Sequence, residues 1–295
     1  MWRQLKQGCF VMEGAVNIGY ITDGKTGVLI DAGLDKQAAN KVLRTLQQEG
    51  LPLQALICTH AHADHYGGAL SIVNKTHARV YAPSFEAMIL EHPYLEPLYL
   101  FHGAEPPASY RVKFLEGPAV KVDEHLHVGE TDLAGLQLAI LPTPGHSTHQ
   151  VSVAYNGVLY ASDAYFGREA LEKHGVPYIV NAKQTKETLH MLLETAYEGA
   201  IPGHGPFEEE YHKTIQMNLQ RHEEVEEALL QLAKEPITFD ELVATVCETF
   251  RVSMKAPTNW SLYRTAVSAY ISPLVDDGVL ELYVENYRLW VQQRP

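Results

Sequence analysis

The chain has 295 residues, of which 46% are hydrophobic and 20% are charged, and its formal net charge at pH 7 is −13. This balance is typical of a globular protein and excludes a disordered or fibrous one; the length allows one large domain, or a main domain with a small second one. The negative charge, in a sequence without any run of Lys or Arg, argues against nucleic acid as a partner.

No stretch of the sequence reaches the ~18 consecutive apolar residues that a membrane helix requires. The first residues, MWRQLKQGCFVMEG, lack the apolar segment and small-residue cleavage site of a secretory signal. The three cysteines are far apart and too few for a disulfide framework. We therefore expect a cytoplasmic protein with no membrane partner.

The first two hundred residues alternate short β-rich runs with helical patterns. Strands are predicted within 20–33, where two strands flank an Asp-Gly turn, and within 54–60, 78–82, 133–145 and 149–163. Helices are predicted within 35–50, 67–77 and 183–196. Apolar strands that alternate with helices predict layered α/β packing, with functional groups on the loops at strand ends.

Residues 91–110 interrupt this pattern with a stretch that is rich in Pro and aromatic residues. Its apolar side chains need a surface to pack on, which favours a segment that covers a cleft over a disordered linker. A plain surface excursion and a contact between subunits remain alternatives.

The sequence pattern changes after residue 207 from alternating strands and helices to mainly helices. A charged amphipathic helix is predicted over 207–235, a second helix opens with a capping box from Thr238 to Glu241, and a third is disturbed or ended by Pro273. A hairpin about Glu285 and Asn286 follows. This pattern is winged-helix-like and raises DNA or RNA binding as a rival function.

Charge argues against that rival, because 207–295 holds 15 Asp and Glu against 8 Lys and Arg, a difference of −7. We therefore predict a catalytic domain over 1–207 and, over 208–295, a small helical domain that packs on it or forms a homodimer.

The sequence HAHADH, residues 60–65, concentrates metal-binding chemistry in one loop. In an extended chain, side chains two residues apart project to the same side, so His60 and His62 are expected to converge on one point. Asp64 and His65 then enter the next turn and are directed to a second point. Imidazole and carboxylate groups are ligands for zinc, iron or manganese, and none of these side chains would help a core without a cation.

More ligands are expected from the ends of later strands. His146 follows a Pro-Gly turn in TPGHS, Asp163 ends a strand in SDAYF, and His204 lies in the tight turn PGHG. Together with HAHADH these residues form an ordered series. In this series, with VLIDAG near the start, residues 10–207 resemble the metallo-β-lactamase fold superfamily, in its branch of dinuclear hydrolases such as glyoxalase II, lactonases and certain ribonucleases.

The resemblance implies a four-layer αββα sandwich that holds two divalent metal ions at one edge. One ion would be bound by His60, His62 and His146, the other by Asp64, His65 and His204, with Asp163 bridging both. Zinc is the expected metal, with iron and manganese as alternatives. Asp31, in VLIDAG, either holds a ligand histidine in its tautomer or caps a turn.

The same resemblance implies a hydrolase that attacks the ester, thioester, lactone or amide carbonyl of a small molecule through a hydroxide bridging the two metals. Asp64 is expected to act catalytically, by passing the proton to the leaving group. Tyr165 either contacts the substrate oxygen as a second catalytic residue or packs in the core. A glutathione thioester would be expected to require a positively charged pocket, and the acidic C-terminal segment offers few cations. A nuclease, or a non-catalytic metal scaffold, is the alternative.

Overall fold

The computed structural model describes residues 1–294, and its largest sheet has seven strands. The strand order is β1-β2-β3-β4-β5-β6-β7. Strands β1 to β4 are antiparallel neighbours, whereas β4, β5, β6 and β7 run parallel. Their bounds are β1 Trp2–Lys6, β2 Cys9–Met12, β3 Ile18–Thr22, β4 Gly27–Ile30, β5 Ala55–Ile57, β6 Arg79–Ala82 and β7 Glu124–His125.

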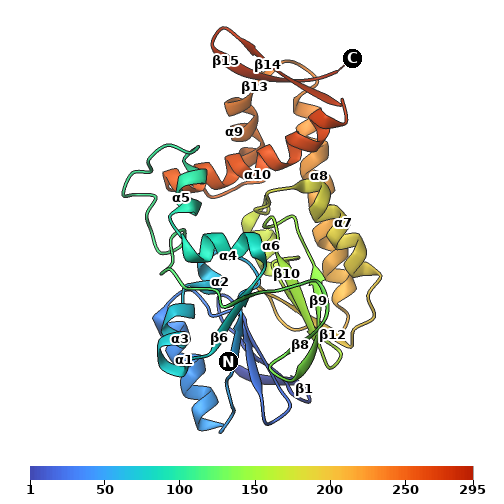
Figure 1. Cartoon of the computed structure of the whole chain (residues 1–295). Helices are drawn as coiled ribbons and strands as arrows, with labels where there is room; N and C mark the ends of the chain where they lie inside the picture. The colour runs from blue at the N-terminus through green and yellow to red at the C-terminus, as the bar shows by residue number, and fades with distance from the viewer. Residues whose placement is uncertain (295) are drawn as a thin grey trace.

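A second sheet of five strands packs against the first (Figure 1). Its order is β12-β11-β10-β9-β8, with one parallel pair, β11 and β12. The bounds are β8 Gly129–Leu133, β9 Leu136–Pro142, β10 Val151–Tyr155, β11 Val158–Ser162 and β12 Gly199–Pro202.

Helices cover the outer face of each sheet, so the main body has four layers, αββα. On the first sheet lie α1 Lys36–Gln48, α2 Ala63–Tyr66, α3 Ala69–Thr76 and α4 Ser84–Glu91. On the second sheet lie α7 Ala182–Leu193 and the first half of α8 Tyr211–Leu232, with α6 Arg168–His174 packed beside α8. The predicted sandwich is confirmed.

Side-chain alternation in β4 shows why the sheet has two covered faces. Val28 and Ile30 belong to the core between the two sheets, whereas Leu29 belongs to the core under the helices. All three are buried, because successive side chains of a strand point to opposite faces. The apolar run GVLI therefore fills two cores at once.

A C-terminal unit, residues 234–294, stands at one end of the sandwich (Figure 1). It contains a small sheet of order β13-β15-β14 and two helices. The bounds are β13 Ile237–Thr238, α9 Phe239–Thr249, α10 Pro257–Asp276, β14 Leu280–Glu285 and β15 Arg288–Gln293. The description of this unit as winged-helix-like stays a prediction.

Details of this unit both confirm and correct the sequence interpretation. The capping box of Thr238 and Glu241 opens α9 as predicted. Pro273 lies inside α10, which continues to Asp276, so this proline does not end the helix. The hairpin turn lies one residue later than predicted, at Asn286 and Tyr287, since both have positive φ and Glu285 pairs with Arg288.

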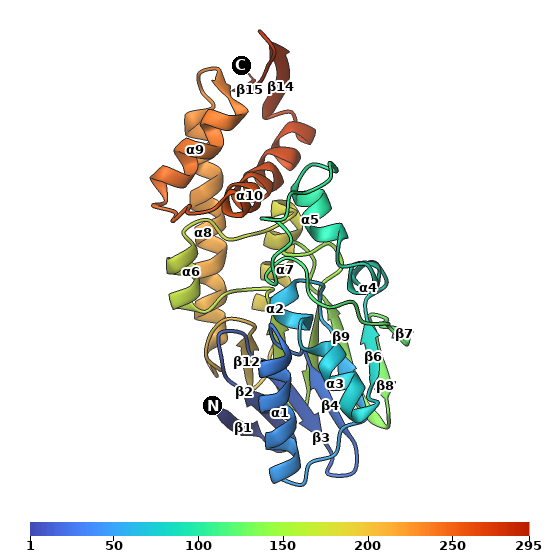
Figure 2. The same ribbon diagram turned by 90° about the vertical axis from the view of Figure 1, so that its left-hand side faces the viewer.

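Helix α8 joins the two bodies as one continuous element of 22 residues (Figure 2). Tyr211 and Ile215, near its start, belong to the core of the sandwich, whereas Val225 and Leu229 belong to the core of the C-terminal unit. The proposed boundary at 207/208 precedes this helix and stays a prediction. No helix within 1–294 is long and apolar enough to cross a lipid bilayer.

The segment 91–110 contains one short helix, α5 Leu95–Leu100, which packs against α10. The Tyr110 hydroxyl lies 3.0 Å from the carbonyl oxygen of Pro257 and 2.8 Å from Oγ of Ser261, which fastens the end of the segment to α10. The segment is therefore packed between the sandwich and the C-terminal unit.

Candidate metal centre

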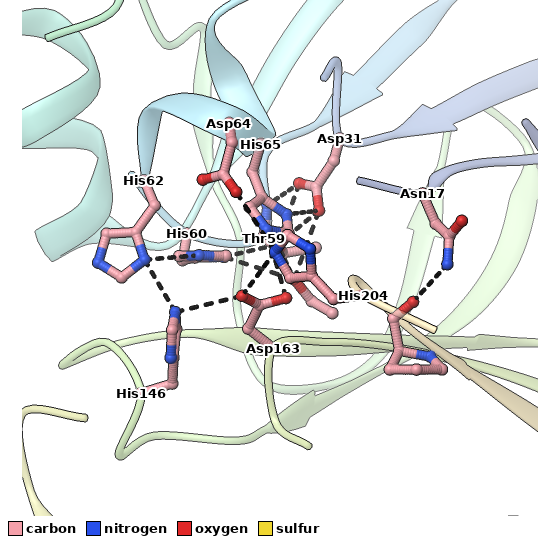
Figure 3. Close-up of polar contacts among 12 residues, drawn as sticks. Asn17, Asp31, Thr59, His60, His62, Asp64, His65, His146, Asp163 and His204 are labelled. Carbon is pink, nitrogen blue, oxygen red and sulfur yellow. Dashed lines mark hydrogen bonds and ion pairs between the residues drawn. The ribbon is translucent and has the colours of Figure 1, made fainter. Parts of the chain in front are cut away.

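The HAHADH loop begins where β5 ends and has the two-part geometry that its spacing predicts. His62 has extended backbone angles and immediately precedes α2. Asp64 and His65 lie within the single turn of α2. The extended part therefore presents His60 and His62, and the helical turn presents Asp64 and His65 (Figure 3).

The remaining three predicted ligands come from the ends of second-sheet strands. His146 follows β9, Asp163 follows β11 directly, and His204 follows β12. All three point toward the HAHADH loop (Figure 3). The seven side chains, called here the ligand cluster, are His60, His62, Asp64, His65, His146, Asp163 and His204.

Three ring nitrogens converge in the first half of the cluster. Nδ1 of His62 lies 3.1 Å from Nε2 of His60 and 2.8 Å from Nε2 of His146. The ligand atoms of these three residues all lie within 4.8 Å of one another. Such a group matches the first ligand set that the sequence suggested.

The second half of the cluster contains Asp64, His65 and His204, whose ligand atoms also lie within 4.8 Å of one another. Oδ2 of Asp64 is 3.3 Å from Nε2 of His204. The carboxylate of Asp163 lies between the two halves, since its Oδ2 is 3.4 Å from Nε2 of both His146 and His204. Its other oxygen, Oδ1, is 3.3 Å from Nε2 of His65.

Hydrogen bonds outside the cluster fix which ring nitrogen of three histidines faces inward. Nδ1 of His146 lies 2.9 Å from the carbonyl oxygen of Tyr178, and Nδ1 of His204 lies 2.8 Å from that of Ala15. A carbonyl only accepts, so each Nδ1 carries the proton. Each Nε2 therefore faces the cluster and is the ring nitrogen available to a metal ion.

Asp31 holds the third of these histidines. Its Oδ2 lies 2.8 Å from Nδ1 of His65, and its Oδ1 accepts a hydrogen bond of 2.9 Å from the backbone N–H of Thr59. Asp31 is buried and has a φ of 63°, a left-handed conformation that Asp tolerates better than most residues. The first alternative for Asp31, holding a ligand histidine, agrees with this geometry.

Burial keeps the first three imidazoles neutral. It holds the pKa of His60 well below its ordinary value of 6.5, lowers the pKa of His62 to about 4, and lowers the pKa of His146 to about 3. A neutral imidazole is the form that binds a metal ion.

In the second half of the cluster, nearby carboxylates favour the positively charged form of the two histidines. Burial alone would lower the pKa of His65 and of His204, but nearby carboxylates, Asp163 foremost, outweigh it. The pKa of His65 lies well above its ordinary value, and that of His204 rises to about 10. Conversely, burial would raise the pKa of Asp163, yet His204 and His65 hold it well below its usual range.

Unpartnered atoms show that the residues fit a cation. Nε2 of His65 and Oδ1 of Asp163 are buried and lie 3.3 Å apart, but within the described residues neither has a partner with hydrogen-bond geometry, although each such atom normally finds one. Gly203 leaves room beside them, since a Cβ atom there would lie 2.1 Å from Oδ1 of Asp163. A divalent metal ion would satisfy both atoms.

Glu86, on α4, connects the two ligand loops and was missed by the sequence interpretation. Its Oε2 accepts a hydrogen bond of 3.0 Å from the N–H of Ala61. Its Oε1 accepts bonds of 2.6 Å from Oγ of Ser147 and 2.9 Å from the N–H of His149. Ala61 and Ser147 are direct neighbours of ligands, so Glu86 fixes their spacing.

The cluster forms one wall of a cavity of about 220 Å³. Glu96 and Tyr178 line it, and neither was predicted. Burial raises the pKa of Glu96 well above its usual range, with Asp64 and Glu86 adding to the effect. The lining residues are His62, Asp64, Glu96, Phe114, Leu115, His146, Asp163, Phe166, His174, Tyr178, His204 and Leu262.

Tyr165 does not line this cavity. Its side chain is 1% exposed and packs in the core with Leu189 of α7 and Tyr211 of α8. This is the packing alternative of the sequence interpretation, since the chain leaves β11 with Asp163 toward the cluster and Tyr165 toward the helices. His149 is exposed, and its ring centre lies 5.3 Å from that of Phe85.

Curated relatives share either most of the chain or its first part. A Drosophila melanogaster protein named "Beta-lactamase-like protein 2 homolog" is 24% identical over 275 residues, which cover 90% of this chain and 84% of the relative. A hydroxyacylglutathione hydrolase of Rhodopseudomonas palustris is 31% identical over 154 residues, 51% of this chain and 48% of the relative. The likeness to the second kind thus spans about half of each protein.

Solved structures show the same fold over the whole chain. A metallo-beta-lactamase family protein from Thermus thermophilus superposes with a TM-score of 0.74 at 22% identity, covering 99% of this chain and 100% of the other. A beta-lactamase domain protein from Burkholderia ambifaria also has a TM-score of 0.74, at 16% identity, with coverage of 99% and 94%.

The family model of the metallo-beta-lactamase superfamily matches residues 11–234, well over half of the chain. This span includes all seven residues of the ligand cluster and α8. With the αββα sandwich and the paired histidine and aspartate groups at its edge, the match shows that the chain belongs to the metallo-beta-lactamase superfamily.

Proposed function

We propose that this metal-dependent hydrolase binds two divalent cations in the ligand cluster and cleaves a carbonyl ester, thioester, lactone or amide bond of a small molecule. The observation that carries the proposal is the convergence of two groups of ligand atoms, with Asp163 between them, on a cavity wall. The proposed metal is zinc, with iron and manganese compatible with the same ligands.

His60, His62 and His146 would hold one cation, Asp64, His65 and His204 the other, and Asp163 both. Divalent cations at such a site supply Lewis acidity, which lowers the pKa of water and stabilises negative charge on a carbonyl oxygen. The side chains contribute rigidity, because the outward Nδ1 atoms are bound to fixed acceptors.

Asp64 is the proposed proton carrier. It is partly exposed, lines the cavity, and has one oxygen directed to His204. Burial would raise its pKa, but His65 and His204 outweigh this effect and lower the pKa to about 2, so the carboxylate is ionised at neutral pH. Its place on the cavity wall, next to where the reacting carbonyl would lie, is what supports its proposed role in passing a proton to the leaving group.

The walls favour an uncharged substrate. Among residues 1–294, no Lys or Arg lines the cavity, whereas Glu96 does. The name of the Rhodopseudomonas relative suggests a glutathione thioester, but the carboxylates of glutathione would find no Lys or Arg side chain among the described residues that line this cavity. Among thioesters, the proposal favours those without the carboxylate groups of glutathione.

The C-terminal unit gives little support to a nuclease, because Asp and Glu outnumber Lys and Arg there. A nucleic-acid-binding protein would be retained on heparin and would bind with a steep salt dependence. We propose neither behaviour for this protein. A homodimer is proposed as well, to be tested by light scattering of the purified protein.

The test combines metal analysis with a substrate screen. Metal-reconstituted protein is assayed on lactones, thioesters, carboxylic esters, phosphodiesters and RNA. Asp163→Ala should lose metal and activity together, whereas Asp276→Ala, an exposed control on α10, should keep both. Unchanged metal content in Asp163→Ala would contradict the bridging role, and turnover of only RNA or phosphodiesters would replace this proposal by the nuclease.

A further inference from the structure

A second cavity, of about 560 Å³, adjoins the metal cavity, and His62 lines both. Its volume lies in the range of small-molecule binding pockets. The segment 84–103, which includes α4 and α5, supplies most of its wall. The apolar residues in its lining are Phe85, Ile89, Leu95, Leu98, Tyr99 and Val180.

The walls of this second cavity are apolar and open to solvent. Phe85 is 38% exposed, Leu95 36% and Tyr99 41%. Exposed apolar side chains that gather around a hollow are a recognised sign of a ligand site, since their contact with water is unfavourable. The segment 84–103 is otherwise well anchored by Glu86 and by the contact of α5 with α10, so this exposure is not a frayed end.

The charge of the second cavity restricts what it can accept. Its lining contains no Lys, Arg, Asp or Glu within the part of the chain that the structure describes, and His62 and His102 are its only titratable groups apart from Tyr99. A charged ligand group buried there would lose its hydration without gaining a partner, which is costly. The occupant must therefore be apolar and uncharged.

We propose that this apolar cavity binds the acyl chain of the substrate, so that the natural substrate carries an uncharged, apolar chain of several carbons on its hydrolysable carbonyl. The inference rests on the proposed hydrolase function and specifies its substrate class. The position of His62 supports it, because this member of the ligand cluster also lines the apolar cavity, so a chain of several carbons on a carbonyl held beside the cluster lies next to that cavity.

The test measures kcat/KM of the full-length, metal-loaded protein on p-nitrophenyl esters from acetate to decanoate. Each methylene buried in the cavity should raise kcat/KM by up to about four-fold until the cavity is full. Leu98→Trp, which fills the cavity, should abolish this rise, as expected when the burial of the chain is lost. Leu282→Trp, the same change on the distant, exposed β14, should behave as wild type.

A binding measurement keeps the inference separate from turnover. Calorimetric titration with 2-decanone, which cannot be hydrolysed, should detect binding to wild type and to Leu282→Trp but not to Leu98→Trp. Val180→Phe, which narrows the cavity from another segment, serves if Leu98→Trp does not fold.

Acetate turnover with no dependence on chain length and no ketone binding would overturn the inference and leave the hydrolase proposal standing. No turnover of these esters or of any lactone, thioester or amide, with ketone binding that Leu98→Trp removes, would overturn the hydrolase proposal and keep the apolar site. No turnover of any of these compounds together with no ketone binding would overturn both.

Discussion

Replacing Glu86 with Gln tests whether one buried carboxylate sets the spacing of the two ligand loops. Glu86 is fully buried and accepts three hydrogen bonds, from the N–H of Ala61, the hydroxyl of Ser147 and the N–H of His149. Glutamine has the same shape but only one accepting oxygen in its amide group. In either orientation the amide nitrogen faces a backbone N–H, of Ala61 or of His149, so two donors oppose each other.

The expected cost follows from that conflict. Leaving one buried N–H unsatisfied costs about 1–3 kcal/mol. At about 2–4 °C for each kcal/mol in a protein near this size, the melting temperature should fall by roughly 2–12 °C. Because Ala61 lies between His60 and His62, the loop should also hold its metal less tightly, by about 10–100-fold if the effect matches that of other supporting residues.

The assay is thermal unfolding with saturating zinc, together with zinc titration against a competing chelator. Glu187→Gln on α7 is the matched control, since Glu187 is exposed and makes no hydrogen bond that the structure of 1–294 records. A melting temperature within about 1 °C of wild type and an unchanged zinc affinity would refute the argument that Glu86 fixes the two loops.

Three further outcomes are expected. Asp31→Asn should lower metal affinity or activity about 10–100-fold. The reason is that Asn fits the left-handed backbone at this position but presents an altered partner to Nδ1 of His65. Metal affinity is measured by competition with a chelator. Metal removal by a chelator should lower the melting temperature, which zinc should restore, because the cation binds only the folded cluster; an unchanged melting temperature would count against the site. Burial lowers the pKa of His222 to about 3, and two nearby cations add to this effect. As the pH falls, His222 is protonated near pH 6.5 in the unfolded chain but only near pH 3 in the folded chain. The contribution of His222 to stability is therefore complete above pH 6.5 and is lost as pH falls. His222→Gln keeps an acceptor for the hydroxyl of Tyr270, and the difference in free energy of unfolding between wild type and this variant should shrink by up to about 1.4 kcal/mol per pH unit below 6.5. A difference that stays constant with pH would contradict this.

The ligand residues could be predicted because they obey local rules. Histidine and aspartate at the ends of apolar strands have no use in a core, and the two-residue spacing of His60 and His62 reflects extended backbone. Both signals can be read from a single sequence. His146, Asp163 and His204 also follow from strand ends. Strands β9, β11 and β12 run in the same direction, since β10 is antiparallel to both β9 and β11 and β12 is parallel to β11, so their carboxyl ends lie at one edge of the sheet.

Glu86 could not be predicted in the same way. It is the third residue of α4, where an acidic side chain is favoured by the helix dipole and is usually exposed to solvent. Only the packing of α4 beside two distant loops turns it into a buried acceptor. The sequence signal of Glu86 was therefore that of an ordinary helix start.

The cavity walls were hidden for a related reason. Glu96, on α5, and Leu262, on α10, come together because the C-terminal unit packs against the segment 91–110. No local periodicity encodes that contact. Tyr165 shows the converse case, since its closeness to Asp163 along the chain does not carry over to the cavity.

Helix α10 supplies Leu262 to the metal cavity and Thr265 to the apolar one, yet it contributes no member of the ligand cluster. Evolution can thus vary the molecules that the enzyme accepts by mutating a helix whose changes leave its catalytic chemistry intact. Homologues would therefore be expected to keep the same reaction while differing in the substrates that they accept. Exchanging this helix between homologues would be a direct way to change substrate selectivity.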